Sequence, residues 1–190
     1  MTKKSMSLTS ALVPLDKNLP AEIAAPIGAL VARHAYLDWL LGQVMYSLME
    51  ISIKQGRVIM KLPRPRVYIC AVKDLFEFHG LETTFDFERL AKKLEAADRA
   101  RREITRSVYM RDTDSKELRI VLARSHWDPG PGGELQPELE TLDRRLLDEK
   151  RDVVDEAVKS AEKLQVVTDK LLRKRHQERR SRRALDRRRS

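Results

Sequence analysis

Apolar side chains recur at alternating spacings of four and three residues along the early part of the chain, which places them on one face of an α-helix. This stripe consists of Leu30, His34, Leu37, Leu41, Val44, Leu48 and Ile51. A second apolar flank consists of Ala35, Trp39, Gly42, Met45 and Met49. One neighbouring helix does not cover two flanks. We therefore expect a long helix from Pro20 that packs on two sides, against neighbours in its own chain or against a second subunit.

Two further helices are expected before residue 85. Ser52 followed by Gln55 resembles a capping box, the pattern in which two side chains satisfy the first free amides of a helix. A short helix therefore starts there. The next apolar stripe predicts a helix from Arg64 to His79, and Gly80 directly after it is a typical helix C-terminus.

The helix expected over residues 87–107 carries a cation on its apolar face. Its stripe consists of Leu90, Leu94, Ala97, Arg101 and Ile104, and Thr83, Thr84 or Asp86 is available to cap its start. An unpaired cation on a buried face is costly. Arg101 therefore either pairs with an acid such as Asp38 or Glu50, or it lines a site that binds anions. The sequence leaves both interpretations open.

After this helix the pattern changes to short β-branched and apolar segments, over residues 108–111 and 118–123, separated by a polar turn. This arrangement predicts a β-hairpin. Pro137 then opens a last helix with the stripe Leu139, Leu142, Leu146, Val153, Ala157, Leu164, Val167 and Leu171. A helix from Pro137 to Arg175 would be about 60 Å long at 1.5 Å per residue. We expect its distal half to project or to pair as a coiled coil.

Composition supports an all-α domain. Charged residues make up 35% of the 190 residues and aromatic residues 5%, a profile that argues against a sandwich or a barrel. The expected fold is an antiparallel helical bundle with a two-stranded β-hairpin insertion and a long C-terminal helix. The single Cys70 excludes an internal disulfide and a multi-cysteine zinc site, and its apolar neighbours predict a buried, inert thiol. No cofactor or metal is expected.

The net charge of +9 is concentrated at the C-terminus. Residues 173–190 hold ten Lys and Arg against two acids, whereas residues 1–172 hold 28 basic and 27 acidic residues. We expect a disordered leader over residues 1–19, a helical domain over residues 20–172 and a basic tail over residues 173–190. Such a tail serves solubility or binds a polyanion such as RNA. The expected nucleic-acid contacts are Arg173, Lys174, Arg175, Arg179, Arg180, Arg182, Arg183, Arg187, Arg188 and Arg189.

Two segments resemble HEPN-like domains, small all-α proteins of bacterial defence and toxin–antitoxin systems. They are residues 35–39 (Ala-Tyr-Leu-Asp-Trp) and residues 101–109 (Arg-Arg-Glu-Ile-Thr-Arg-Ser-Val-Tyr), and the hairpin and residues 124–129 (Arg-Ser-His-Trp-Asp-Pro) add to the likeness. The resemblance covers roughly residues 27–172. It implies a dimer in which Arg, four to six residues and His form a metal-independent RNA-cleaving site.

This chain departs from the family pattern at the histidine. The resemblance places Arg101 at the motif arginine, Arg102 at a usually polar position and Arg106 where the histidine belongs. Arginine stays protonated and cannot act as a base, although it can hold phosphate by paired hydrogen bonds. His34 on the first stripe is one replacement, and His126 beyond the hairpin is another. For both histidines a structural role is the simpler interpretation.

Three functions are consistent with this pattern. The first is a dimeric HEPN-like domain that binds RNA or another anionic partner and cleaves it weakly or not at all. The second is an active ribonuclease that uses Arg101 with His34 or His126. The third is a module that binds a partner protein through its C-terminal helix. No uncharged stretch is longer than the eleven residues of 39–49, which is too short to span a membrane. We expect a cytoplasmic protein with no membrane partner.

Overall fold

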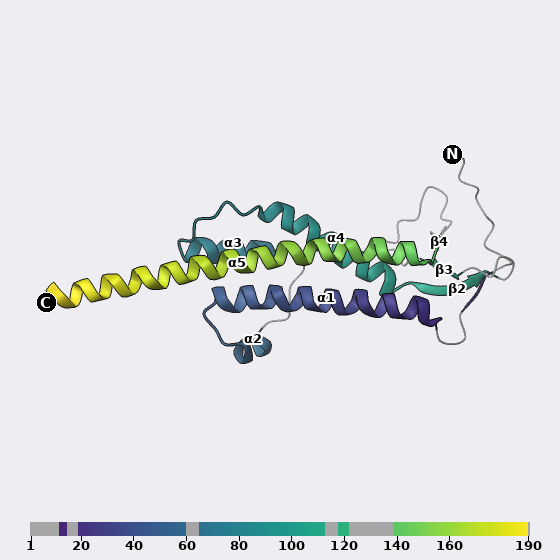
Figure 1. The fold of residues 1–190 in the computed structure, drawn as a ribbon, viewed down its shortest axis with the longest axis horizontal. Helices are drawn as coiled ribbons and strands as arrows, with labels where there is room; N and C mark the ends of the chain where they lie inside the picture. The colour runs from purple at the N-terminus through teal and green to yellow at the C-terminus, as the bar shows by residue number, and fades with distance from the viewer. Residues whose placement is uncertain (1–11, 15–18, 60–64, 113–117, 122–138, 190) are drawn as a thin grey trace. The chain divides into compact units, whose positions relative to one another are not determined.

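The computed structural model describes residues 12–14, 19–59, 65–112, 118–121 and 139–189, and it is mostly helical (Figure 1). The helices are α1 (Ala21–Leu48), α2 (Ile53–Ile59), α3 (Pro65–Phe78), α4 (Phe87–Thr105) and α5 (Arg144–Arg189). The strands are β1 (Leu12–Pro14), β2 (Val108–Asp112), β3 (Leu118–Val121) and β4 (Leu139–Thr141). The all-α prediction with a β-hairpin and a long C-terminal helix is confirmed.

Backbone contacts divide the chain into two compact units. Unit 1 comprises residues 1–31 and 99–152, and unit 2 comprises residues 32–98 and 153–190. Helices α1, α4 and α5 each contribute residues to both units. The two units are described separately.

Unit 1 contains an antiparallel sheet in the order β1-β2-β3-β4. The predicted hairpin forms its centre, where Tyr109 lies opposite Ile120, and β1 and β4 pair with its two edges. Residues 12–14 of the expected leader are therefore strand rather than disordered chain. The buried apolar residues of this unit are Ile23, Leu30, Ala100, Ile104, Ile120, Leu142 and Leu147.

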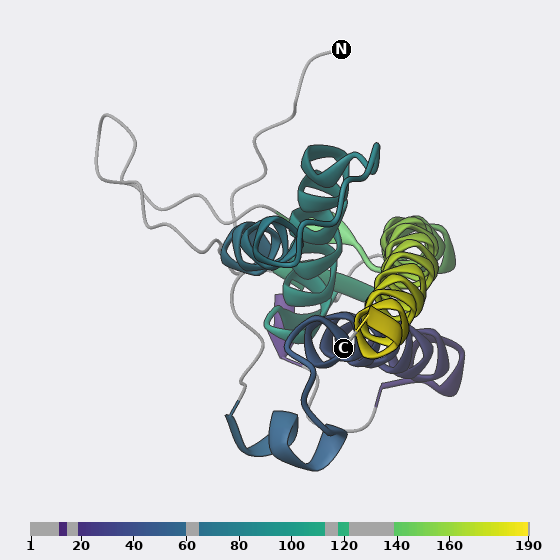
Figure 2. The same cartoon turned by 90° about the vertical axis from the view of Figure 1, so that its left-hand side faces the viewer.

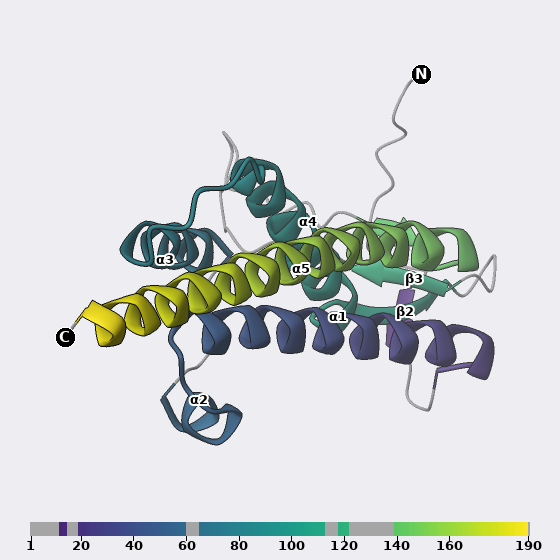
Figure 3. The same cartoon turned by 60° about the vertical axis from the view of Figure 1, so that its left-hand side comes forward.

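Unit 2 is a helical bundle. The second half of α1 and α5 lie side by side and run in the same direction (Figures 1 and 3), with Arg33 Nε 2.6 Å from Asp155 Oδ1. Helices α3 and α4 contact each other through the Phe76 and Phe87 rings, which meet edge to face with centroids 5.4 Å apart. The buried Tyr68 hydroxyl of α3 donates to the Leu41 carbonyl of α1 at 3.2 Å, and burial raises the pKa of this phenol.

Local sequence signals set several helix ends as expected. Ser52 and Gln55 form the predicted capping box, in which the Ser52 amide donates to Gln55 Oε1 at 2.9 Å. Of the three candidate caps for α4, Asp86 is the one that accepts from a first-turn amide, that of Arg89. Gly80 ends α3 in the left-handed region with φ of 62°.

Helix α2 lies on the far side of α1 from α3 and α4 (Figures 1 and 2).

The start of the last helix differs from the prediction. Residues 139–141 form β4, and α5 begins at Arg144 because the Asp143 carboxylate accepts the Leu146 amide at 2.8 Å. The buried face is also displaced by about one residue, since Leu147 and Val154 are buried whereas Val153 is 37% exposed. The predicted positions Ala157 and Leu164 are buried. Successive side chains on a helix point in directions about 100° apart, so two adjacent residues lie on different faces. Packing against the rest of the protein, rather than the spacing of apolar residues in the sequence, selects the face that is buried.

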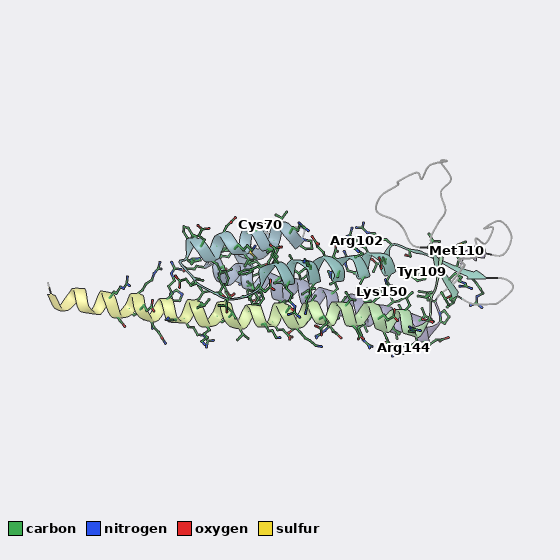
Figure 4. The ribbon with its side chains drawn as sticks, turned by 90° about the horizontal axis from the view of Figure 1, so that it is seen from above. Cys70, Arg102, Tyr109, Met110, Arg144 and Lys150 are labelled. Atoms are coloured by element: carbon green, nitrogen blue, oxygen red, sulfur yellow. The ribbon has the colours of Figure 1, made fainter. Side chains whose placement is uncertain are left out.

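One prediction about burial is wrong and another holds only in part. Cys70 is exposed on α3 rather than buried (Figure 4). On α1 the first stripe is buried from Leu30 to Leu48, whereas the second flank is partly buried: Met45 is buried and Trp39 is 49% exposed. Gly42 of that flank is buried, and Gly56 of α2 packs against the neighbouring Tyr46 ring.

Candidate nucleic-acid interface

Helix α5 continues beyond the last core residue as a cationic segment. Leu172 is the last buried side chain of the described part of α5, and the helix extends to Arg189. We call residues 173–189 the C-terminal cationic segment. Its exposed cations with described side chains are Arg173, Lys174, Arg179, Arg180 and Arg182. Arg183, Arg187, Arg188 and Arg189 belong to the helix, but their side chains lie outside the described residues.

The cations of this segment point to all sides of the helix. Successive residues are rotated by about 100°, so Arg173 and Arg180 share one side whereas Lys174 and Arg182 lie on others. Lys174 is paired within the segment, at 4.0 Å from Glu178. Such exposed pairs contribute little to stability. Because positive charge dominates, the electrostatic potential around the segment is positive.

Arg175 differs from the other predicted contacts of the tail. Its side chain is only 17% exposed, and its guanidinium bonds Nδ1 of His79 and lies 3.6 Å from Glu50 Oε1. Arg175 is therefore held against unit 2. The sequence marks His79 only as a helix-end residue, and nothing in the spacing connects it to a residue 96 positions later.

The three arginines of the HEPN-like motif lie at the C-terminal end of α4, in unit 1. Arg101 and Arg102 are half-buried and each has an interaction partner, whereas Arg106 is exposed just beyond the helix. The Arg106 amide donates to the Arg102 carbonyl, which continues the last turn. Arg102 and Arg106 therefore share a face, and Arg101 is rotated from it. Cations at a helix C-terminus are stabilised by the helix dipole, which accounts for this position without a ligand.

Side chains next to this turn are engaged within the protein. Lys150 of α5 reaches α4 and pairs with Glu103 at 2.5 Å (Figure 4). The Ser107 hydroxyl donates to the Glu103 carbonyl, and the Tyr109 hydroxyl donates to the Ile104 carbonyl. Partial burial raises the pKa of Tyr109. These contacts join the end of α4 to β2 and to the start of α5.

His34 is buried in α1, with 6% of its surface exposed, and its Nδ1 lies 3.3 Å from Asp38 Oδ2 one turn further along. This contact matches the structural interpretation of the residue. His34 belongs to unit 2 and the three motif arginines belong to unit 1. His126 and the 124–129 segment lie outside the described residues.

The exposed cations of the C-terminal cationic segment are mostly arginines. Guanidinium groups hold phosphate oxygens by paired hydrogen bonds. Across the described ranges, no group of three or more His, Cys, Asp and Glu is placed to hold a metal ion. None of the helices that the structure describes has an apolar stretch sufficient to cross a lipid bilayer.

Comparisons with known proteins leave the family open. No protein-family model matches the chain, and neither the curated proteins nor the solved structures contain a match. The resemblance to HEPN-like domains therefore stays a prediction.

Proposed function

We propose that this protein binds RNA through the C-terminal cationic segment and does not cleave it. The observation that supports the proposal is the continuation of α5 as an exposed, Arg-rich helix after its last buried residue, Leu172. These exposed residues do not pack in the core, so core packing does not explain why so many of them are cationic. Arginine suits the partner, because its planar fork matches phosphate geometry.

Salt dependence tests the electrostatic part of this proposal. RNA binding releases counterions, and the slope of log K against log salt is about −0.7 per phosphate contact for a single strand. Five contacts would give a slope of about −3.5. We expect a labelled single-stranded RNA to bind the full chain with a slope of this order, and deletion of residues 173–190 to flatten it. Absence of RNA affinity at low salt would favour the partner-protein module instead.

A matched pair of triple variants separates the segment from net charge. Replacing Arg179, Arg180 and Arg182 with Gln is expected to reduce the magnitude of the slope by about 2. The control replaces three exposed arginines elsewhere, Arg66, Arg144 and Arg145, and removes the same charge. We expect it to change the slope by less than about 0.5. Equal losses in both variants would mean that overall charge, not this segment, binds RNA.

The absence of cleavage is a separate part of the proposal. In the HEPN-like interpretation, Arg106 stands at the proton-transfer position, and arginine does not exchange a proton at neutral pH. The His34 imidazole is buried against Asp38. We expect labelled cellular RNA to stay intact during incubation with the purified protein. Specific cleavage that Arg101→Ala abolishes would establish the ribonuclease alternative.

We also propose that the protein forms a homodimer through the outer face of α1. Tyr36 and Trp39 are exposed there and stack on one another, with ring centroids 5.7 Å apart. Exposed aromatic pairs are typical of interfaces. Light scattering at micromolar concentration should give twice the 22.0 kDa chain mass. Tyr36→Ala combined with Trp39→Ala should give monomers, whereas Phe78→Ala, at an exposed aromatic of α3, should not. A monomeric wild-type protein would contradict the proposal.

A further inference from the structure

His79 stands where two helix ends meet α5 in unit 2. The imidazole follows the last residue of α3, and its Nε2 contacts the carbonyl of Leu48, the last residue of α1. On its other side Nδ1 contacts the guanidinium of Arg175. Arg175 is the third residue after Leu172, where the core of the unit ends. His79 therefore joins the core to the first turn of the C-terminal cationic segment.

The partners of His79 define its protonation state. A carbonyl oxygen only accepts, so Nε2 carries the hydrogen and donates to Leu48. A guanidinium only donates, so Nδ1 has a free lone pair and accepts from Arg175. The imidazole that satisfies both contacts is the neutral Nε2–H form. A protonated imidazole would place an N–H group and a second positive charge against the Arg175 guanidinium.

The charged groups around this contact act in opposite senses. Arg175 from α5 places a positive charge directly against the imidazole. Glu50, in the segment after α1, lies 3.6 Å from Arg175 and favours positive charge nearby. Glu50 is 46% exposed, and ion pairs with that exposure are weak. From α3 itself, the Phe78 ring meets the imidazole edge to face. The direct His79–Arg175 contact is therefore the dominant one.

We propose that His79 is a proton-sensitive latch that holds Arg175 against unit 2 when the imidazole is neutral and releases it when the imidazole is protonated. Released, Arg175 joins the exposed cations of the C-terminal cationic segment. Histidine is the side chain whose charge ordinarily changes between pH 5 and 8, so mild acidification operates the latch. Its consequence for RNA binding rests on the proposed function.

Nuclear magnetic resonance of the full chain tests the latch without RNA. At pH 7.5 the nitrogen–hydrogen correlations of the His79 ring should report the Nε2–H tautomer. The Arg175 Nη–H signal should be protected from solvent exchange. At pH 5.5 that signal should broaden, with a midpoint that follows the His79 titration. His79→Gln should make it independent of pH. His176→Gln, at the exposed histidine beside Arg175, should behave as wild type.

Glu50→Gln provides a second variant that leaves His79 in place. It removes the carboxylate that retains Arg175 when the imidazole is protonated, so at pH 5.5 the Arg175 signal should broaden more than in the wild type. An Arg175 signal that is unchanged across the range in wild type, or that changes equally in His79→Gln, would overturn the latch.

Binding of labelled poly(U) then measures the consequence. The measurement uses a His176→Gln background, so that the exposed histidine of the segment adds no charge of its own. In that background the salt slope should increase in magnitude by about 0.7 between pH 7.5 and 5.5, the effect of one added phosphate contact. Arg175→Ala should remove this increase, and so should His79→Gln. Lack of poly(U) binding at both pH values would refute the proposed function, and the resonance data would still decide the latch.

Discussion

Glu156 shows how one side chain joins two helices of unit 2. Its carboxylate accepts from Lys159 on its own helix at 2.9 Å and from Lys93 of α4 at 3.0 Å. The hydrogen bonds from Lys159 and then Lys93 lower its pKa to about 2. The Lys159 pair follows from a spacing of three residues on one helix. The sequence does not predict Lys93, which lies 63 residues away.

The lowered pKa of Glu156 predicts how stability depends on pH. Because the pKa in the folded state lies below the ordinary value of 4.5, this carboxylate stabilises the fold fully above pH 4.5. The contribution is lost as the pH falls from there toward 2. We expect side-chain resonances of Glu156 to titrate near pH 2, and Lys93→Gln to raise that midpoint. Titration of wild-type Glu156 near 4.5 would show that the lysines do not hold it.

At the scale of elements, α2 approaches α1 closely at Gly56. A methyl group added at Gly56 would overlap the Tyr46 ring of α1. The capping box starts α2, and one turn later the α2 backbone lies close to the Tyr46 ring. Glycine inside a short helix ordinarily destabilises that helix. Here glycine allows the α2 backbone to approach the Tyr46 ring.

The Gly56 contact reverses the usual effect of alanine in a helix. Overpacking against Tyr46 should make Gly56→Ala destabilising by about 1–3 kcal/mol and should increase hydrogen exchange in α2. Gly28→Ala is the control, because nothing lies within 4 Å of the added methyl in α1. There alanine should stabilise the protein by about 0.5–1 kcal/mol. Denaturant unfolding measures both, and equal stabilisation would mean that α2 is not fixed by this contact.

For the molecule as a whole, the end of the core on α5 predicts what truncation does. Removing residues 178–190 leaves Leu172 and the Arg175 contacts in place, so the thermal midpoint should change by less than about 2 °C. Leu164→Ala, at a fully buried position of the same helix, should cost about 2–5 kcal/mol. Circular dichroism during heating compares them. A large loss on truncation would mean that the cationic segment stabilises the fold.

The sequence by itself determined the helical class, the hairpin, most helix ends and the exposed cations of the tail. These features depend on local periodicity, on capping residues such as Asp86 and on local charge density. Tertiary structure decided which stripe of α5 is buried, that Cys70 is exposed and that Arg175 belongs to unit 2. Each of these depends on which residues distant in sequence become neighbours. The spacing of apolar residues shows which side chains share a face of a helix, but it does not show which face the rest of the protein covers.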